Sequence, residues 1–172
     1  MLSSAAESLR RGELSMSEYA DVELDGPGRE RALAAIEKQM QVWGLTMPDV
    51  KPLPLDFGLG RFDEVGETEF WIANEPEHGY CGKLLFLFDG QTCPQHHHEV
   101  KHETFYVLKG RIRMCLDDGE RIMEQGEVLA MAPGMGHSFT GLGPALVLEV
   151  SMPSVRRDSF FEDERIGDGG VI

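Results

Sequence analysis

The residues best suited to chemistry are histidines that gather in one short stretch. Four of the six histidines fall within seven residues: His96, His97, His98 and His102. On an extended strand, His96 and His98 project from the same face because side chains alternate. Glu103 follows, and His137 comes after a Pro-Gly turn. Imidazoles and a carboxylate that converge inside a fold suit a divalent metal ion, whereas a solvated histidine-rich loop is the alternative interpretation.

Two of these histidines are expected to face away from such a site. His97 lies between His96 and His98, so strand alternation turns it to the opposite side. His102 directly precedes Glu103 and should also face outward. A contact of His102 with a metal ligand or a substrate stays open at this point.

The elements that precede the histidines read as helical. In residues 28–43, apolar side chains recur at spacings of three and four, which predicts an amphipathic helix with Leu33, Ile36, Met40 and Trp43 on one face. Gly44 stands where a helix takes its terminal glycine. A shorter helix is predicted over residues 4–11.

From Pro48 onward, short β-rich runs alternate with turns. Residues 83–88 are apolar on both faces and predict a central strand. The sequence Asp117-Asp118-Gly119 predicts a hairpin turn. The other predicted strands are residues 70–73, 104–108, 111–116, 121–123, 127–131 and 145–150. This pattern is typical of an all-β barrel or jelly roll, and the charged tail after Pro153 either caps the barrel or frays.

Composition limits the classes of partner. The chain has 172 residues, a length typical of one domain, and 30 acidic against 16 basic residues give a net charge of −14. The absence of a basic stripe argues against binding nucleic acid or an anionic membrane. The sequence has no long apolar run and no secretory signal pattern. Three cysteines without a CxxC pair, read as reduced packing residues, favour a cytoplasmic protein: Cys81, Cys93 and Cys115.

The spacing around the histidines resembles the first cupin motif. Its fixed positions correspond to Gly90, His96, His98, Glu103 and Gly110, and every interval between them fits the motif. Residues 126–137 resemble the second cupin motif, although Ala132 stands where the family prefers proline. The resemblance covers residues 70–151.

The cupin resemblance implies a fold and a metal site. The fold would be an all-β, cupin-type β-barrel (jelly roll) with an N-terminal helical extension. We expect residues 1–50 to form the helical segment, packed on a barrel of residues 51–172, within one structural domain. The implied metal ligands are His96, His98, Glu103 and His137. Manganese is the expected ion, with zinc, cobalt, nickel or iron as alternatives.

A longer stretch resembles the D-lyxose isomerase family. Lys83 opens a strand, and the segment from Gly90 through Gln91 and Pro94 to His98 follows that family's pattern. The resemblance covers residues 43–151. Residues 103–110 depart from it and are closer to cupin phosphosugar isomerases, and the tail resembles the mannose-6-phosphate isomerase type of cupin.

These resemblances imply a metal-dependent aldose–ketose isomerase. The substrate would be a free sugar, with D-lyxose/D-xylulose or D-mannose/D-fructose as the pairs. A metal ion polarises the sugar oxygens, and a base moves a proton between C1 and C2. Lys83 and Glu149 are the candidate catalytic residues, because a buried lysine can lose its proton readily. A purely structural Lys83–Glu149 ion pair is the alternative.

Other functions stay open at this point. An Fe(II)-dependent dioxygenase and a non-enzymatic small-molecule-binding cupin are also compatible with three histidines and a glutamate. A phosphosugar isomerase would need a basic cluster, for which the candidates are Arg111, Arg113, Arg156 and Arg157. The low overall basicity favours a free sugar. A homodimer is expected, since cupins commonly dimerise and an exposed barrel edge benefits from pairing.

Overall fold

The computed structural model describes residues 19–172, so the helix predicted over residues 4–11 lies outside the described residues. The described chain forms a helix followed by short strands. The elements are α2 (Gly26–Val42), β1 (Pro52–Leu55), β2 (Glu67–Glu75), β3 (Tyr80–Leu87), β4 (Thr92–His97), β5 (Glu103–Lys109), β6 (Arg111–Leu116), β7 (Gly119–Glu124), β8 (Val128–Met131), β9 (His137–Gly141), β10 (Ala145–Ser151) and β11 (Phe160–Phe161).

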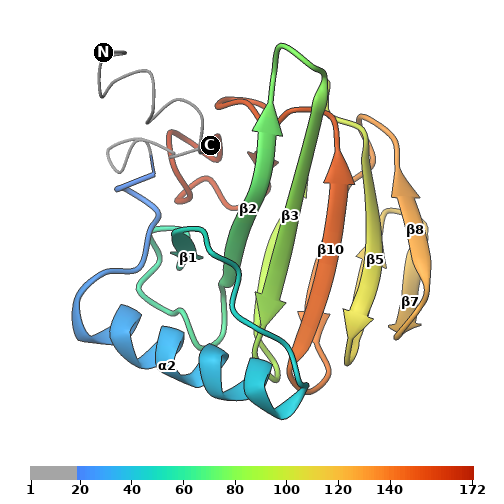
Figure 1. Cartoon of the computed structure of the whole chain (residues 1–172). Helices are drawn as coiled ribbons and strands as arrows, with labels where there is room; N and C mark the ends of the chain where they lie inside the picture. The colour runs from blue at the N-terminus through green and yellow to red at the C-terminus, as the bar shows by residue number, and fades with distance from the viewer. Residues whose placement is uncertain (1–18) are drawn as a thin grey trace, which may run out of the picture.

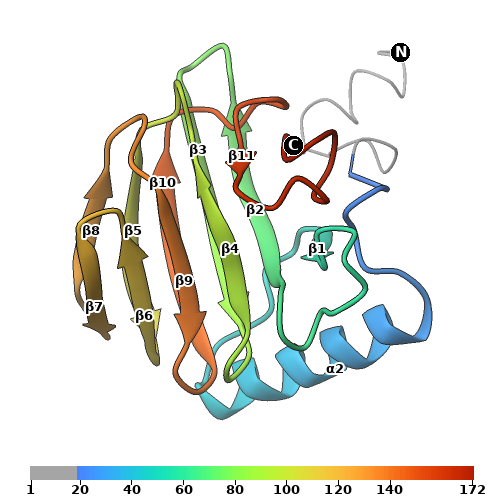
Figure 2. The same ribbon diagram turned by 180° about the vertical axis from the view of Figure 1, so that it is seen from behind.

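The strands form two antiparallel sheets that face each other. One sheet has the order β1-β2-β3-β10-β5-β8, and Figure 1 shows it from its outer side. The other has the order β11-β4-β9-β6-β7 and faces the viewer in Figure 2. Apolar side chains from both sheets fill the space between them, among them Phe105, Val107, Ile112 and Met114. The predicted all-β jelly roll is confirmed, and β3 lies inside its sheet as expected.

Helix α2 begins two residues earlier than predicted and ends one residue earlier, at Val42. Gly26 has a φ of +59°, and Pro27 lies in the first turn, where proline's missing N–H costs nothing. At the other end, the N–H of Gly44 donates to the carbonyl of Gln41 at 3.0 Å, and Gly44 has a φ of +68°. This left-handed residue terminates the helix as the sequence predicts.

The helix packs against one end of the outer face of the six-stranded sheet (Figure 1). Ile36 and Met40 are fully buried against Phe70, Phe86 and Leu146. Leu33 and Trp43 lie at the margin of this cluster, while the buried position missing from the prediction is Ala32. Within residues 19–172, no helix has the length and apolar character that crossing a membrane would require.

All seven predicted strands form, and six of them have different ends. β6 has the predicted bounds, whereas β2 begins at Glu67 rather than Phe70. The sequence patterns did not predict β1, β9 or β11. β1 contains two prolines, which do not favour a strand. It is an edge strand, where a residue without an N–H group is tolerated.

The C-terminal tail caps the barrel. β11 pairs with β4, with Phe160 opposite His97 and Phe161 opposite His96. The last residue, Ile172, is buried in the core between the sheets. Of the two predicted outcomes, capping is therefore the one observed, and it brings the tail beside the histidines.

Candidate active site

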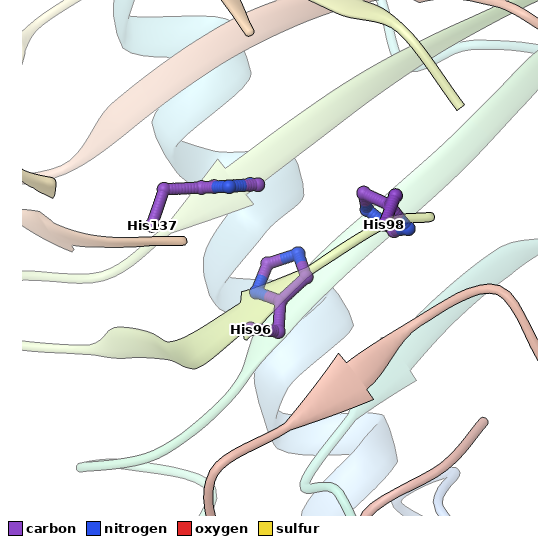
Figure 3. Close-up of side chains that lie close together, drawn as sticks. All are labelled: His96, His98 and His137. Atoms are coloured by element: carbon purple, nitrogen blue, oxygen red, sulfur yellow. The ribbon is translucent and has the colours of Figure 1, made fainter. Parts of the chain in front are cut away.

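Three histidines converge inside the barrel. His96 on β4 and His137 at the start of β9 are partners across adjacent strands, and His98 follows directly after β4. One ring nitrogen from each of the three lies within 4.8 Å of the others. Figure 3 shows the three side chains gathered around one point. All three residues are buried.

The second nitrogen of each ring fixes its orientation. Each Nδ1 lies within hydrogen-bond distance of a backbone carbonyl: His96 of Pro94 at 2.8 Å, His137 of Met135 at 3.1 Å and His98 of Asp158 at 2.6 Å. A carbonyl only accepts, so Nδ1 carries the proton and donates it. The lone pair of each Nε2 is therefore left for a metal ion.

Glu103 adds a carboxylate to this cluster. Its Oε1 lies 3.4 Å from Nε2 of His98, and its Oε2 lies 3.5 Å from Nε2 of His137. Both of these nitrogens and Oε2 are buried and have no hydrogen-bond partner within residues 19–172. Unpartnered buried polar atoms are costly. A divalent cation bound between them would satisfy all three, so the residues fit the metal that the histidine cluster suggests.

The protonation states of these side chains also suit a cation. Burial lowers the pKa of His96 and His137, so both imidazoles are neutral near pH 7. Burial alone would raise the pKa of Glu103, but Lys101 and His98 hold it well below its usual range. Neutral imidazoles with an ionised carboxylate are the forms that bind divalent metals.

Two lysines and three glutamates form a buried chain of alternating charge next to the histidines. Lys101 Nζ forms an ion pair with Glu103 and lies 3.4 Å from Oε1 of Glu149. Lys83 Nζ lies 3.9 Å from the other oxygen of Glu149 and 3.2 Å from Oε1 of Glu69. The chain thus links Glu69 to the carboxylate beside the histidines.

The expectation that Lys83 loses its proton readily is wrong. Burial works to lower the pKa of Lys83, but Glu149 and Glu69 outweigh it and hold the pKa well above its usual range. The ammonium also lies 4.3 Å from the centroid of the Trp71 ring, a cation–π contact. Lys83 is therefore a cation and a hydrogen-bond donor at every physiological pH. It pairs with Glu149 as the structural alternative supposed, inside the pocket.

A pocket joins the histidines to the charged chain. Its polar lining includes His96, His98, Glu103, Glu149 and Lys83, with Glu67, Glu69 and Lys101. Its apolar walls include Phe105, Phe139 and Phe161. Phe161 stacks on the ring of His96 with centroids 5.0 Å apart. Carboxylates outnumber ammonium groups in this lining, which favours a bound cation.

Asp158 in the C-terminal tail holds the loop between β4 and β5. Its Oδ1 accepts the N–H groups of Glu99 and Val100 at 3.0 Å, and its Oδ2 accepts that of Lys101 at 2.9 Å. Its backbone carbonyl accepts a hydrogen bond from Nδ1 of His98. One tail residue therefore fixes both His98 and the backbone that carries Lys101.

Other residues considered from the sequence lie elsewhere. His102 is exposed, and His97 stacks on Phe160 outside the cluster. The arginines proposed for phosphate do not line the pocket: Arg111, Arg113, Arg156 and Arg157. Arg156 and Arg157 pair instead with Asp21 and Asp168.

Sequence reasoning missed four polar residues of this region: Lys101, Glu67, Glu69 and Asp158. Alternation could have identified three of them. Lys101 stands two residues before Glu103 and so shares its face, and Glu67 and Glu69 precede Trp71 at the same period. Asp158 carries no such signal, because its partners lie almost 60 residues away along the chain.

Comparisons with known proteins agree with this geometry. A family model described as D-lyxose isomerase matches residues 1–111, and one described as a cupin domain matches residues 86–151. The D-lyxose/D-mannose isomerase of Thermosediminibacter oceani is 30% identical over 140 residues, which cover 64% of this chain and 76% of that protein. The D-lyxose ketol-isomerase of Thermofilum sp. is 26% identical and covers 84% and 94% of the two chains.

Solved structures support the fold. The ligand-free L-ribose isomerase of Cellulomonas parahominis superposes with a TM-score of 0.66, covering 87% of this chain and 97% of that chain at 15% identity. This likeness concerns the arrangement of the strands. The match to the family model over more than half of the chain adds the sequence relationship, and the chain belongs to the D-lyxose isomerase family, with a cupin fold.

Proposed function

We propose that the protein is a metal-dependent aldose–ketose isomerase that acts on a free sugar. D-Lyxose with D-xylulose, or D-mannose with D-fructose, are the expected pairs, in line with the names of its relatives. The observation that carries the proposal is the position of Glu149. Lys101 lies between the carboxylates of Glu149 and Glu103 and pairs with both. Glu149 therefore places a proton acceptor beside the proposed metal site.

His96, His98, His137 and Glu103 would hold the metal. When bound, a divalent ion supplies Lewis-acid polarisation of the C1 and C2 oxygens of a hydroxy-aldehyde. Imidazole and carboxylate ligands suit manganese, our first choice, as well as iron, cobalt, nickel and zinc. The three histidines offer this ligand set without any change of tautomer, since each Nδ1 proton is already donated to a carbonyl.

Glu149 is the proposed base that moves a proton between C2 and C1. Its Oε1 is occupied, because it accepts a hydrogen bond from Ser151 at 2.7 Å and lies near Lys101. Its Oε2 lies 3.9 Å from Nζ of Lys83, beyond hydrogen-bond distance. Oε2 is thus the oxygen that accepts the C2 proton and returns it to C1.

Lys83 acts as a donor rather than as the base. Its ammonium stays protonated between Glu69 and Glu149. It can therefore donate a hydrogen bond to a sugar oxygen while it keeps the proposed base ionised. This assignment keeps both catalytic candidates and gives them different roles.

The pocket favours an uncharged sugar over a phosphosugar. Both of its lysines are already paired with carboxylates, and none of the four candidate arginines lines it. A phosphate group would need an unpaired basic cluster. A polyol instead requires donors and acceptors in mixture, which the lysine–glutamate chain provides.

A substrate panel tests the function. Protein loaded with Mn²⁺, Co²⁺, Ni²⁺, Zn²⁺ or Fe²⁺ would be incubated with D-lyxose, D-mannose and mannose 6-phosphate in D₂O. We expect ketose formation and deuterium incorporation at the proton-transfer position with a free sugar. Oxygen consumption with Fe²⁺ and no ketose would favour a dioxygenase, and sugar binding without turnover with any metal would favour a binding protein.

We also infer a cytoplasmic homodimer. The outer face of the six-stranded sheet exposes Ile72, Val128 and Val150, each with more than half of its surface accessible. A second copy packed on this face would cover them. The three cysteines are free, which suits a reducing compartment. Sedimentation equilibrium tests the dimer, and a monomer at micromolar concentration would contradict it.

A further inference from the structure

Glu67 is a pocket residue with no assigned role. Strand β2 turns Glu67, Glu69 and Trp71 into the pocket at alternate positions. Glu69 uses both of its oxygens, because Oε2 accepts from Trp71 Nε1 at 2.5 Å and Oε1 pairs with Lys83. One oxygen of Glu67, by contrast, has no hydrogen-bond partner within residues 19–172.

The carboxyl group of Glu67 is buried and incompletely paired. The residue is 5% exposed, and its Oε2 has no hydrogen-bond partner within residues 19–172. Leaving such a group unsatisfied is costly, so native proteins rarely keep one without a ligand or a water. The neighbouring side chains that face it from β1 and β4 are Leu55 and Cys93.

Within residues 19–172, no lysine lies close enough to Glu67 to form an ion pair with it. Lys83 forms its ion pairs with Glu69 and Glu149, and Lys101 forms its pairs with Glu103 and Glu149. Burial, with the added repulsion of Glu69, raises the pKa of Glu67 well above its usual range. The uncharged acid form carries an O–H group that can donate a hydrogen bond, unlike the other pocket glutamates.

We propose that Glu67 is a substrate-binding residue, which donates a hydrogen bond from its carboxyl O–H to the sugar hydroxyl on C4 or C5. The inference rests on the proposed isomerase function and adds the contact that recognises the rest of the sugar. Strand β2 carries Glu67, whereas the four proposed metal ligands lie on or beside β4, β5 and β9, so we assign the hydroxyl that Glu67 binds to the part of the sugar that does not react. A site built to bond a hydroxyl discriminates strongly against a sugar that lacks it.

The test combines substitutions with deoxy sugars. Glu67→Leu removes the donor with similar bulk, and Glu67→Gln restores a neutral donor of nearly the same shape. Metal-loaded wild type and both variants would be assayed with D-lyxose, 4-deoxy-D-lyxose and 5-deoxy-D-lyxose. Metal Kd from calorimetry and melting temperature are recorded for each protein. Glu75→Leu, at the end of the same strand and outside the pocket, is the matched control.

We expect Glu67→Leu to lower kcat/KM by about 100-fold with metal Kd within about twofold of wild type, and Glu67→Gln to recover at least tenfold of that loss. One of the deoxy sugars should show a similar loss with wild type but little further loss with Glu67→Leu, because the two changes remove the same bond. A Glu67→Leu protein as active as wild type, or losses that simply add for both deoxy sugars, would overturn the assignment in favour of a buried water.

If the proposed isomerase function is wrong, sugar binding still tests the Glu67 contact. If wild type converts no sugar, the same panel is run as a binding measurement with metal-loaded protein and D-lyxose. A Kd that weakens in Glu67→Leu and recovers in Glu67→Gln still supports the contact. An unchanged Kd contradicts it. If Glu67→Leu does not fold, the Glu67→Gln protein is tested alone with D-lyxose and the two deoxy sugars. A Glu67→Gln protein that discriminates between D-lyxose and the deoxy sugars as fully as wild type supports a neutral donor. Loss of all activity in Glu67→Gln contradicts it.

Discussion

Lys101 Nζ lies 3.4 Å from Oε1 of Glu149 and, on its other side, forms an ion pair with the carboxylate of Glu103. One ammonium thus joins the proposed metal ligand to the proposed base. Burial works to lower the pKa of Lys101, but Glu149 and Glu103 outweigh it, so the lysine stays charged. Both carboxylates therefore pair with the same buried ammonium group.

Replacing Lys101 by methionine should lower the free energy of unfolding more in the metal-free protein than in the metal-loaded protein. Breaking a buried ion pair by removing one partner costs about 3–5 kcal/mol, because the remaining charge stays buried. A divalent ion on Glu103 would replace part of the lost compensation, so the loss should be smaller with metal. Urea unfolding of both proteins, with and without Mn²⁺, measures the difference.

A surface lysine provides the matched control for that experiment. Lys51 lies 3.8 Å from Glu23 and is exposed, so Lys51→Met should change the free energy of unfolding by less than about 1 kcal/mol. Equal losses for Lys101→Met with and without metal would show that Glu103 and the metal do not share this compensation.

His137→Ala should abolish metal binding and activity together. The substitution removes one of the three converging nitrogens and leaves Glu103 Oε2 without its neighbour at 3.5 Å. We expect the metal Kd to rise at least about 100-fold, measured by calorimetry on metal-free protein. His102→Ala is the control, since His102 is exposed and should keep the wild-type Kd. Unchanged affinity in His137→Ala would remove this residue from the ligand set.

The motif residues could be predicted because their geometry is local. His96 and His98 share a face through strand alternation, and the turn before β9 returns His137 to a position opposite His96. The strand bounds were less predictable: β2 begins with Glu67 and Glu69, a residue type that does not favour a strand, and pairing with β1 and β3 includes this segment in the sheet.

Alternation could place Lys101 on the same face as Glu103, but it could not predict that Lys101 is buried. Lys101 stands in a run of polar residues, HHHEVKHE, that is typical of a solvated loop. Its burial follows from contacts with Glu149 on a distant strand and from the hold of Asp158 on its backbone. Similarly, the charged tail was expected either to cap or to fray, because no local pattern distinguishes Asp158 from the other acidic residues around it.

Asp158→Ala should weaken metal binding more than it disturbs the barrel. The substitution frees three backbone N–H groups of the loop between β4 and β5, and the looser backbone no longer holds its carbonyl against His98 Nδ1. Loss of a residue that orients a metal ligand typically costs about 10–100-fold in affinity. Calorimetry with Mn²⁺ measures the Kd, and circular dichroism follows the fold.

Another acidic residue of the same tail separates this effect from a general loss of charge. Asp163 is half-buried and pairs with Arg165 two residues along, which lowers its pKa to about 2. Asp163→Ala should leave the metal Kd within about twofold of wild type. If both aspartate variants bind metal equally well, the tail only covers the barrel and does not position His98.

Glu67→Gln should make the metal-free protein more stable at neutral pH and leave its stability unchanged in acid. Burial raises the pKa of Glu67 above its ordinary value of 4.5, so between 4.5 and the raised value the folded state binds a proton that the unfolded state has released. Stability of the wild type therefore falls as pH rises through this window, whereas glutamine has no proton to lose. Urea unfolding at pH 4, 6 and 8 should show a gain for the variant that grows with pH, and a gain of the same size at all three values would mean that Glu67 does not titrate above its ordinary range.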